Sequence, residues 1–370
     1  MYPPVIIPAF FDHRNLSVAD YERCMRKATL IAPAHAIETV ENQGGCSFAL
    51  IATREWETGV SGAPADSRCI IQFRPLRHAV RIDFAREAEI LYPPWAPRTS
   101  DHGYVDLGPN LRVQICSLKY IPGLRFADVQ PTSRVLDGAT LERLESVVTD
   151  LAHFFARGWH TRLSDHHAAS SKQTGRVGST MHSRLRQLAS QLPSADLRRK
   201  ARRIQIAVRR GGLELLPDIL THGDLIPSNL LVNEECWRIR GVIDWAEAEY
   251  LAFGFALYGL DHLLGYMEEL PGARSCCFVR YEQAEMLRAV FWRASAEQAP
   301  ELRNKALYAA VMLARDVGVL MHHGFAWDDG KIDRVVDTRQ EDAMDLEYLT
   351  AFLDPAGTSV RRDSGLWIGL

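Results

Sequence analysis

The sequence is poor in lysine, in net charge and in long apolar runs. Only six of its 43 basic residues are lysines, so a mechanism that needs a lysine at one given place has few candidates. The formal net charge of −3 excludes a global basic field that would draw the chain onto nucleic acid or an acidic membrane. No apolar stretch approaches the roughly 18 residues that a membrane-spanning helix needs. Any charge used in binding must therefore be local.

Cysteine is scarce and unpatterned. The seven cysteines are scattered, which excludes a disulfide scaffold for a chain of this length, and no CxxC pair suggests zinc. The first residues lack a basic segment and are interrupted by prolines, so they make a poor signal peptide. We therefore expect a cytoplasmic protein that binds neither nucleic acid nor a membrane.

The length and the apolar pattern predict two domains. A chain of 370 residues is too long for one small core. Short apolar segments bounded by Gly, Pro, Asp or Ser predict strands in the first third, with one helix between the last two. After Pro122 the pattern becomes mainly helical. It switches to short strands around a polar loop between Leu220 and Trp245, and it is helical again from Ser275 onward. The predicted strands are 46–53, 68–74 and 112–120, and the clearest predicted helices are 82–91, 141–159 and 307–321.

A predicted hairpin with a polar loop in front of it is the most informative segment. The loop holds His222-Gly223-Asp224, Asn229 stands directly before the first strand, and Asp244 stands directly after the second. Antiparallel pairing would bring Asn229 and Asp244 together. Mg²⁺ prefers such oxygen ligands, and a loop carboxylate facing them can accept or orient a hydroxyl proton. This order of residues is that of a phosphoryl-transfer centre.

The segment resembles the hallmark of the aminoglycoside phosphotransferase/choline kinase-like family, HGDxxxxN followed by IDW. The resemblance implies that Asp224 is the catalytic base, that Asn229 and Asp244 are Mg²⁺ ligands, and that His222 is a structural residue of the loop. It also implies ATP and Mg²⁺ as cofactors and a small-molecule hydroxyl acceptor as partner. The expected activity is ATP-dependent transfer of the γ-phosphoryl group to that hydroxyl.

The same resemblance implies a fold. We expect an α+β, bilobal protein-kinase-like fold, in which residues 1–122 form a small nucleotide-binding lobe of antiparallel sheet plus helix. Residues 123–370 would form a larger, mainly helical lobe that carries the catalytic loop and the acceptor pocket.

Four residues of the first lobe are implied in nucleotide binding through the backbone. Gly44 and Gly45 precede the first predicted strand and could form the loop over the phosphates, although a plain hairpin turn would use the same glycines. Lys119 and Ile121 lie in a segment that looks like the hinge between the lobes, where backbone groups would bind adenine.

This sequence departs from the family pattern at the basic residue of the predicted strand 68–74, which precedes the predicted helix 82–91. Such kinases place a lysine there, on the α/β-phosphates, whereas this strand ends in Arg74. Arginine is longer and planar, so the exchange is not conservative. Strands of this QFR type resemble those of a fungal branch of the family. Glu87 or Glu89 on the following helix would be the orienting carboxylate, and Glu87 is the preferred candidate.

The acceptor site is weakly marked. Acidic residues that follow Asp244 could line a pocket for a cationic, amine-bearing alcohol, or could form an exposed acidic face: Glu247, Glu249, Asp261, Glu268 and Glu269. Glu247 is the preferred substrate-binding candidate because it stands three residues after the metal ligand. We expect the pair His322-His323 to be solvated or to cap a helix, and Tyr258 to be a core residue.

Three alternatives to this function stay open. Arg74 and the weak glycine loop favour a nucleotide-binding pseudokinase. A protein kinase is disfavoured because Asp244 is followed by Trp245 and no activation loop ends in an APE-like motif. An enzyme of secondary metabolism with a kinase fold would differ in the fate of its product. The motifs of P-loop ATPases, zinc proteases and α/β-hydrolases are absent from the sequence.

Overall fold

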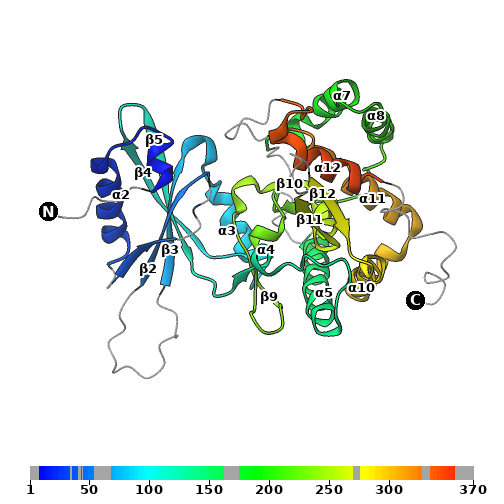
Figure 1. The fold of residues 1–370 in the computed structure, drawn as a ribbon, viewed down its shortest axis with the longest axis horizontal. Coiled ribbons are helices and arrows are strands. Elements are labelled where there is room, and N and C mark those ends of the chain that lie inside the picture. Colours follow the sequence, from blue (N-terminus) through cyan, green and yellow to red (C-terminus); the bar gives the residue numbers. More distant parts are fainter. Residues whose placement is uncertain are drawn as a thin grey trace. The chain divides into compact units, whose positions relative to one another are not determined.

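The computed structural model describes residues 8–33, 36–40, 43, 45–53, 68–161, 175–269, 276–326 and 334–354. The chain forms two compact units (Figure 1). Unit 1 consists of residues 1–90 and 96–121, and unit 2 of residues 91–95 and 122–370. Within the described part of the chain, none of the helices is long and apolar enough to cross a membrane.

Unit 1 is built on an antiparallel sheet of five strands in the order β1-β2-β3-β5-β4. Its strands are β1 (Ala36–Thr39), β2 (Phe48–Thr53), β3 (Arg68–Pro75), β4 (Thr99–Leu107) and β5 (Leu111–Lys119). Its helices are α1 (Ala9–Asp12), α2 (Val18–Ile31) and α3 (Ile82–Leu91), the last of which reaches into unit 2 by one residue. Strand β3 is central, because it pairs with β2 on one side and with β5 on the other.

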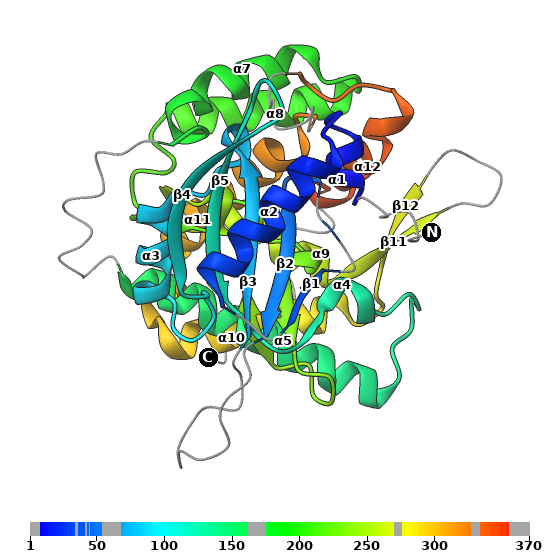
Figure 2. The ribbon, with the colours of Figure 1, turned by 90° about the vertical axis from the view of Figure 1, so that its left-hand side faces the viewer.

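Helix α2 lies across one face of this sheet (Figure 2). It begins with a capping box, in which the Ser17 hydroxyl accepts from the Asp20 amide and the Asp20 carboxylate accepts from the Ser17 amide. Cys24 and Ala28 on the helix pack into a core with Phe48 of β2 and other apolar side chains of the sheet. The helix thereby removes one face of the sheet from water.

Unit 2 is mainly helical. Its helices are α4 (Phe126–Val129), α5 (Gly138–Thr161), α7 (Met181–Gln191), α8 (Ala195–Arg209), α9 (Tyr258–Leu263), α10 (Ala284–Gln298), α11 (Lys305–His323) and α12 (Ala343–Phe352). Three small antiparallel sheets complete it: β6 (Leu124–Arg125) with β8 (Leu230–Val232) and β9 (Ile239–Val242), β7 (Asp218–Thr221) with β10 (Glu249–Ala252), and β11 (Gly265–Glu269) with β12 (Cys276–Arg280).

The core of unit 2 contains a buried cluster of charges. Arg315 on α11 is 1% exposed and binds the carboxylate of Asp261 through Nε at 2.8 Å and Nη2 at 2.7 Å. Arg315 also binds Asp316 at 2.7 Å, and Arg288 on α10 approaches Asp261 at 3.4 Å. Burial of a charge is costly unless an opposite charge meets it, so these pairs must form together when α9, α10 and α11 pack.

The α+β class expected from the sequence is confirmed, and two details of the expectation are wrong. The first third contains the additional helix α2 and the additional strands β1 and β4, so it is more than three strands and one helix. The segment after residue 275 opens with a strand, β12, which pairs with β11, where a helix was expected. The helix predicted at 82–91 is present with the same bounds.

Candidate active site

The hairpin formed by β8 and β9 positions the predicted metal ligands. Leu230 pairs with Val242, and the Ile243 amide donates to the Asn229 carbonyl at 2.9 Å. This register places Asn229, directly before β8, beside the start of the turn that contains Asp244. The antiparallel pairing expected from the motif spacing is therefore present, and two oxygen-bearing side chains stand at one end of the hairpin.

Asn229 also fixes the loop in front of the hairpin. Its Nδ2 donates at 2.8 Å to the Asp224 backbone carbonyl and at 2.8 Å to the Asp224 carboxylate. Both bonds use the amide nitrogen, so the Oδ1 oxygen of Asn229 lies outside them. The Asp224 side chain remains 31% exposed. One carboxylate is thus held in a fixed orientation while part of it stays accessible.

His222 is buried and connects this loop to Ile243, the residue directly after β9. Its Nε2–H donates to the Ile243 carbonyl at 2.8 Å, and its Nδ1 accepts from the Asp224 amide at 3.3 Å. Burial lowers the pKa of His222, which agrees with this neutral tautomer. The Trp245 ring packs edge-on against the imidazole, with ring centroids 4.8 Å apart.

The proton affinity of Asp224 is raised by its surroundings. Burial is the main cause of the raised pKa, and the negative charge of Asp244 acts in the same direction, while the hydrogen bond from the Asn229 side chain opposes both. A carboxyl with a raised pKa holds a proton more readily than an ordinary surface aspartate does. That property suits a group that must take a proton from a hydroxyl.

Two backbone conformations at this centre are unusual. Asp244 has φ of 62° and ψ of 64°, in the left-handed region that non-glycine residues rarely adopt. Gly223 has φ of +83°, and a Cβ added there would lie 2.0 Å from the Glu247 carbonyl oxygen. Only glycine therefore fits between His222 and Asp224.

Replacing Gly223 by Ala is expected to destabilise unit 2 by about 1–3 kcal/mol, because the substitution combines left-handed strain with overpacking against the backbone. Urea unfolding of the two chains measures the difference. The matched control is Gly138→Ala at the start of α5, where an added Cβ would meet nothing within 4 Å. An equal decrease in the free energy of unfolding in the two variants would contradict the requirement for glycine at position 223.

Two side chains near Asp224 were not identified as site residues from the sequence. The Tyr258 hydroxyl donates to the Gly223 carbonyl at 2.9 Å and accepts from the Leu225 amide at 3.2 Å. His322 stacks on the Tyr258 ring at 4.4 Å, and its Nε2 lies 3.8 Å from Asp224 Oδ1. Tyr258 is buried, as expected of a core residue, but its hydroxyl also fixes the catalytic loop.

The expectation that His322 and His323 are solvated or capping is wrong. His323 is 2% exposed and His262 is 4% exposed, and His322 joins both rings from the neighbouring position on α11. The reason is tertiary: α9 and α11 pack so that a polar pair at a helix end faces the interior. No local pattern in the sequence signals this contact.

The predicted nucleotide-binding residues lie in unit 1. Gly44 is outside the described residues, and Gly45 is exposed in a turn. Arg74 is 2% exposed, with Nε donating to the His78 carbonyl at 2.7 Å and Nη1 donating to Gln72 at 3.2 Å. Glu87 is half-buried on α3, and Ile121 is half-buried after β5.

Lys119 ends β5 and is exposed, and its amide donates to the Arg98 carbonyl at 2.9 Å. The backbone N–H of Lys119 is therefore already engaged within unit 1. The Arg74 guanidinium is likewise engaged by groups of its own unit, which distinguishes it from a solvated surface cation.

The acidic residues considered for the acceptor have different environments. Glu247 is exposed and lies 3.9 Å from Arg176. Glu249 is buried and accepts from the amides of Val177 and Gly178. Asp261 belongs to the buried cluster with Arg315. Glu249 and Asp261 therefore stabilise the fold, and the suggestion that they line an acidic pocket is wrong for both.

Comparison with known proteins identifies the segment that carries the motifs. Residues 116–272 match the family described as phosphotransferase enzyme family. The resemblance to a phosphotransferase family is confirmed for this segment. This segment includes the hairpin, the loop with Asp224 and the strand-end Asp244, which are the elements from which the site is built. No curated protein matches the chain.

Solved structures with a similar fold include phosphotransferases. An ethanolamine kinase from Plasmodium vivax is 12% identical, with a TM-score of 0.50, and the alignment covers 92% of this chain and 88% of the kinase. An ADP-bound aminoglycoside phosphotransferase, 14% identical, gives a TM-score of 0.49 over 92% of this chain and 97% of its own. A macrolide 2'-phosphotransferase of type I is 14% identical, with a TM-score of 0.49, and the alignment covers 91% of this chain and 96% of that enzyme. The ethanolamine kinase confirms the expected kinase-like fold.

Proposed function

We propose that the protein is an ATP-dependent phosphotransferase that transfers the γ-phosphoryl group to a hydroxyl of a small molecule. The observation that carries the proposal is the fixed arrangement of Asp224, Asn229 and Asp244 on one loop and one hairpin. The match of residues 116–272 to the phosphotransferase family supports it.

The donor set at the hairpin fits Mg²⁺. Asn229 contributes its amide oxygen, Oδ1, because its two hydrogen bonds to Asp224 use Nδ2. Asp244 contributes a carboxylate. Neither of these two ligands is a thiol or an imidazole. Hard oxygen ligands of this kind are those that Mg²⁺ takes in proteins, with phosphates and water completing the shell. When bound, Mg²⁺ would supply positive charge to the phosphate oxygens.

Asp224 is proposed to act on the acceptor. The acceptor oxygen attacks the γ-phosphorus, the bond from that phosphorus to the oxygen of the leaving ADP breaks, and the hydroxyl proton passes to the Asp224 carboxylate. The bond from Asn229 Nδ2 keeps the carboxylate oriented, and His222 and Tyr258 hold the loop. Transfer of this type depends chiefly on positioning and charge.

We propose that Gly44, Gly45, Arg74, Glu87, Lys119 and Ile121 bind the nucleotide, and that Glu247 contributes to a site for a cationic acceptor. A nucleotide-binding pseudokinase is the second candidate. The observation that favours it is the engagement of Arg74 by His78 and Gln72, since the family's lysine at this position contacts phosphates.

The proposal of a Mg²⁺–nucleotide site is tested by calorimetric titration of the full chain with ADP, with and without Mg²⁺. We expect Mg²⁺ to increase the affinity for ADP in the wild type, and Asp244→Ala to abolish this increase. The matched control is Glu234→Ala, an exposed acid in the turn of the same hairpin. A Mg²⁺ effect that survives in Asp244→Ala would contradict the assignment of this ligand.

A further inference from the structure

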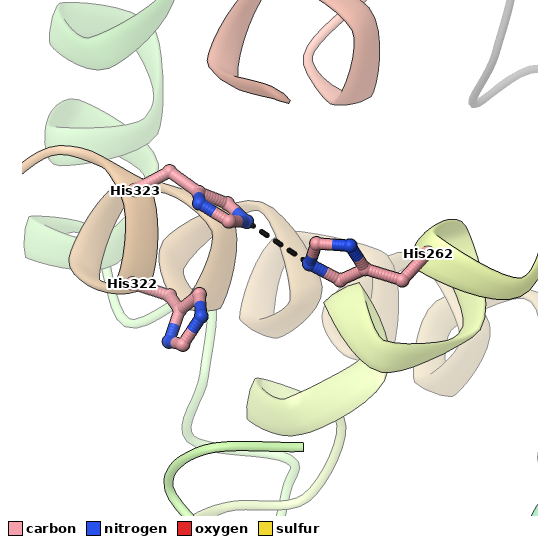
Figure 3. Close-up of side chains that lie close together, drawn as sticks. All are labelled: His262, His322 and His323. Carbon is pink, nitrogen blue, oxygen red and sulfur yellow. Dashed lines mark hydrogen bonds between the residues drawn. The ribbon is translucent and has the colours of Figure 1, made fainter. Parts of the chain in front are cut away.

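Three histidines from two helices converge in the interior of unit 2 (Figure 3). His262 lies on α9, and His322 and His323 are the last two residues of α11. Each offers a ring nitrogen, and these nitrogens lie within 4.8 Å of one another. Nothing in the proposed phosphoryl transfer requires this cluster.

The distance between two of the three rings fits a transition metal. His323 Nε2 and His262 Nε2 are 3.2 Å apart and point toward each other (Figure 3). Zinc–nitrogen bonds of about 2.0–2.1 Å in a tetrahedral shell separate two ligand nitrogens by about 3.3 Å. A hydrogen bond between the two rings has a similar length, so the spacing alone does not distinguish the two arrangements.

The second ring nitrogen of His323, Nδ1, has a carboxylate partner, as is typical of metal-binding histidines. Its Nδ1 lies 2.9 Å from the Asp345 carboxylate. When Nδ1–H donates to that carboxylate, the lone pair of Nε2 is directed at His262, and a carboxylate partner of this kind also raises the basicity of a ligand imidazole.

His322 makes the cluster accessible to an ion from the solvent. His322 is 20% exposed, whereas the other two are nearly inaccessible, so an ion can approach the cluster from the side of His322. The Tyr258 ring stacks on it at 4.4 Å and limits its rotation. The Tyr348 ring packs against His262 with ring centroids 4.5 Å apart and against His323 with ring centroids 4.7 Å apart.

We propose that His262, His322 and His323 form a binding site for a divalent transition-metal ion, with Zn²⁺ as the representative probe. Imidazole nitrogens select such ions over Mg²⁺, so this site is chemically distinct from the oxygen donors of Asn229 and Asp244. Three protein ligands leave a fourth position for water or an exogenous ligand. Asp224 Oδ1 lies 3.8 Å from His322 Nε2, so a bound ion would lie close to the proposed catalytic base.

The test is titration of the full chain with Zn²⁺ after chelator treatment, read as metal bound per chain. We expect one tightly bound equivalent in the wild type, its loss in His262→Gln, and an affinity about 10–100-fold weaker in Asp345→Asn. The control is His182→Gln, an exposed histidine on α7, which should bind like the wild type. Equal binding by His262→Gln, or no stoichiometric binding by the wild type, would overturn the proposal and leave a hydrogen-bonded histidine cluster.

Because a buried variant can fail to fold, Co²⁺ titration of the wild type gives an independent reading. Tetrahedral Co²⁺ with imidazole ligands produces visible absorption bands, which we expect. An intense near-ultraviolet thiolate band would place the metal on cysteines and would contradict the site, as would an absence of visible bands. Neither readout involves phosphoryl transfer, so the two proposals can fail separately.

Discussion

Asp224→Asn is expected to lower kcat for phosphoryl transfer by about 10²–10⁴-fold, the usual contribution of a positioned general base. The amide cannot accept the hydroxyl proton. Its oxygen can still accept the hydrogen bond that Asn229 Nδ2 gives to the carboxylate, so the loop should keep its conformation. Affinity for ADP with Mg²⁺ should therefore change little.

The measurement is ADP release with saturating ATP and Mg²⁺, paired with a direct binding titration. Glu234→Gln is the control, because it removes an exposed carboxylate from the same hairpin and should leave kcat unchanged. An unchanged kcat in Asp224→Asn would remove this residue from the chemistry. Weak binding together with low turnover would indicate instead that Asp224 shapes the loop.

Asp261→Asn is expected to destabilise unit 2 by about 3–5 kcal/mol, the usual cost of removing one partner of a buried ion pair. The asparagine leaves Arg315 without its strongest neutralising charge, at a place where the arginine side chain is 1% exposed. Arg288 also loses the carboxylate 3.4 Å away. Among the described residues, Asp316 and Glu285 are the acids that would still pair with these two cations on α10 and α11.

Urea unfolding followed by circular dichroism measures this loss. The control is Glu282→Gln, which breaks a pair with Arg134 in which both side chains are more than half exposed, and such exposed pairs contribute about 0–1 kcal/mol. Similar losses in Asp261→Asn and Glu282→Gln would show that the buried cluster is no more stabilising than a surface pair. A variant that cannot be purified folded would be tested through the conservative Asp261→Glu.

The centre of the site was predictable from the sequence because it is local. Asn229 and Asp244 are joined by a short hairpin, so the strand pairing that brings them together follows from the apolar pattern and the polar turn between them. Asp224 and His222 belong to the same stretch of chain. Their contacts with Ile243 and Asn229 need no packing between distant elements.

Residues that reach the site from elsewhere could not be predicted. Tyr258 and His322 are separated from Asp224 by 34 and 98 positions, and only the packing of α9 and α11 brings them to it. From the sequence alone, Tyr258 is explained as a core aromatic residue, and His322-His323 as a solvated pair or a helix cap. The pattern therefore contains no signal that assigns either of them to the loop.

Helix α2 and strand β4 of unit 1 were not predicted, because their hydrophobic patterns are weak. The buried positions of α2 are Asp20, Cys24 and Ala28, a narrow stripe of small or polar residues that provides little apolar contrast. Strand β4 lies at the edge of the sheet and is exposed over much of its length, so its residues do not alternate clearly. By contrast, α3 has a clear apolar face, and its bounds followed from the sequence.

Transfer of labelled γ-phosphate from ATP to a panel of amino alcohols tests the central claim most directly. With Mg²⁺ present, we expect a phosphorylated acceptor to appear in step with ADP, and both to be lost in Asp224→Asn. Binding of ADP and Mg²⁺ with no transfer to any member of a broad panel, and no difference between the wild type and Asp224→Asn, would contradict the account.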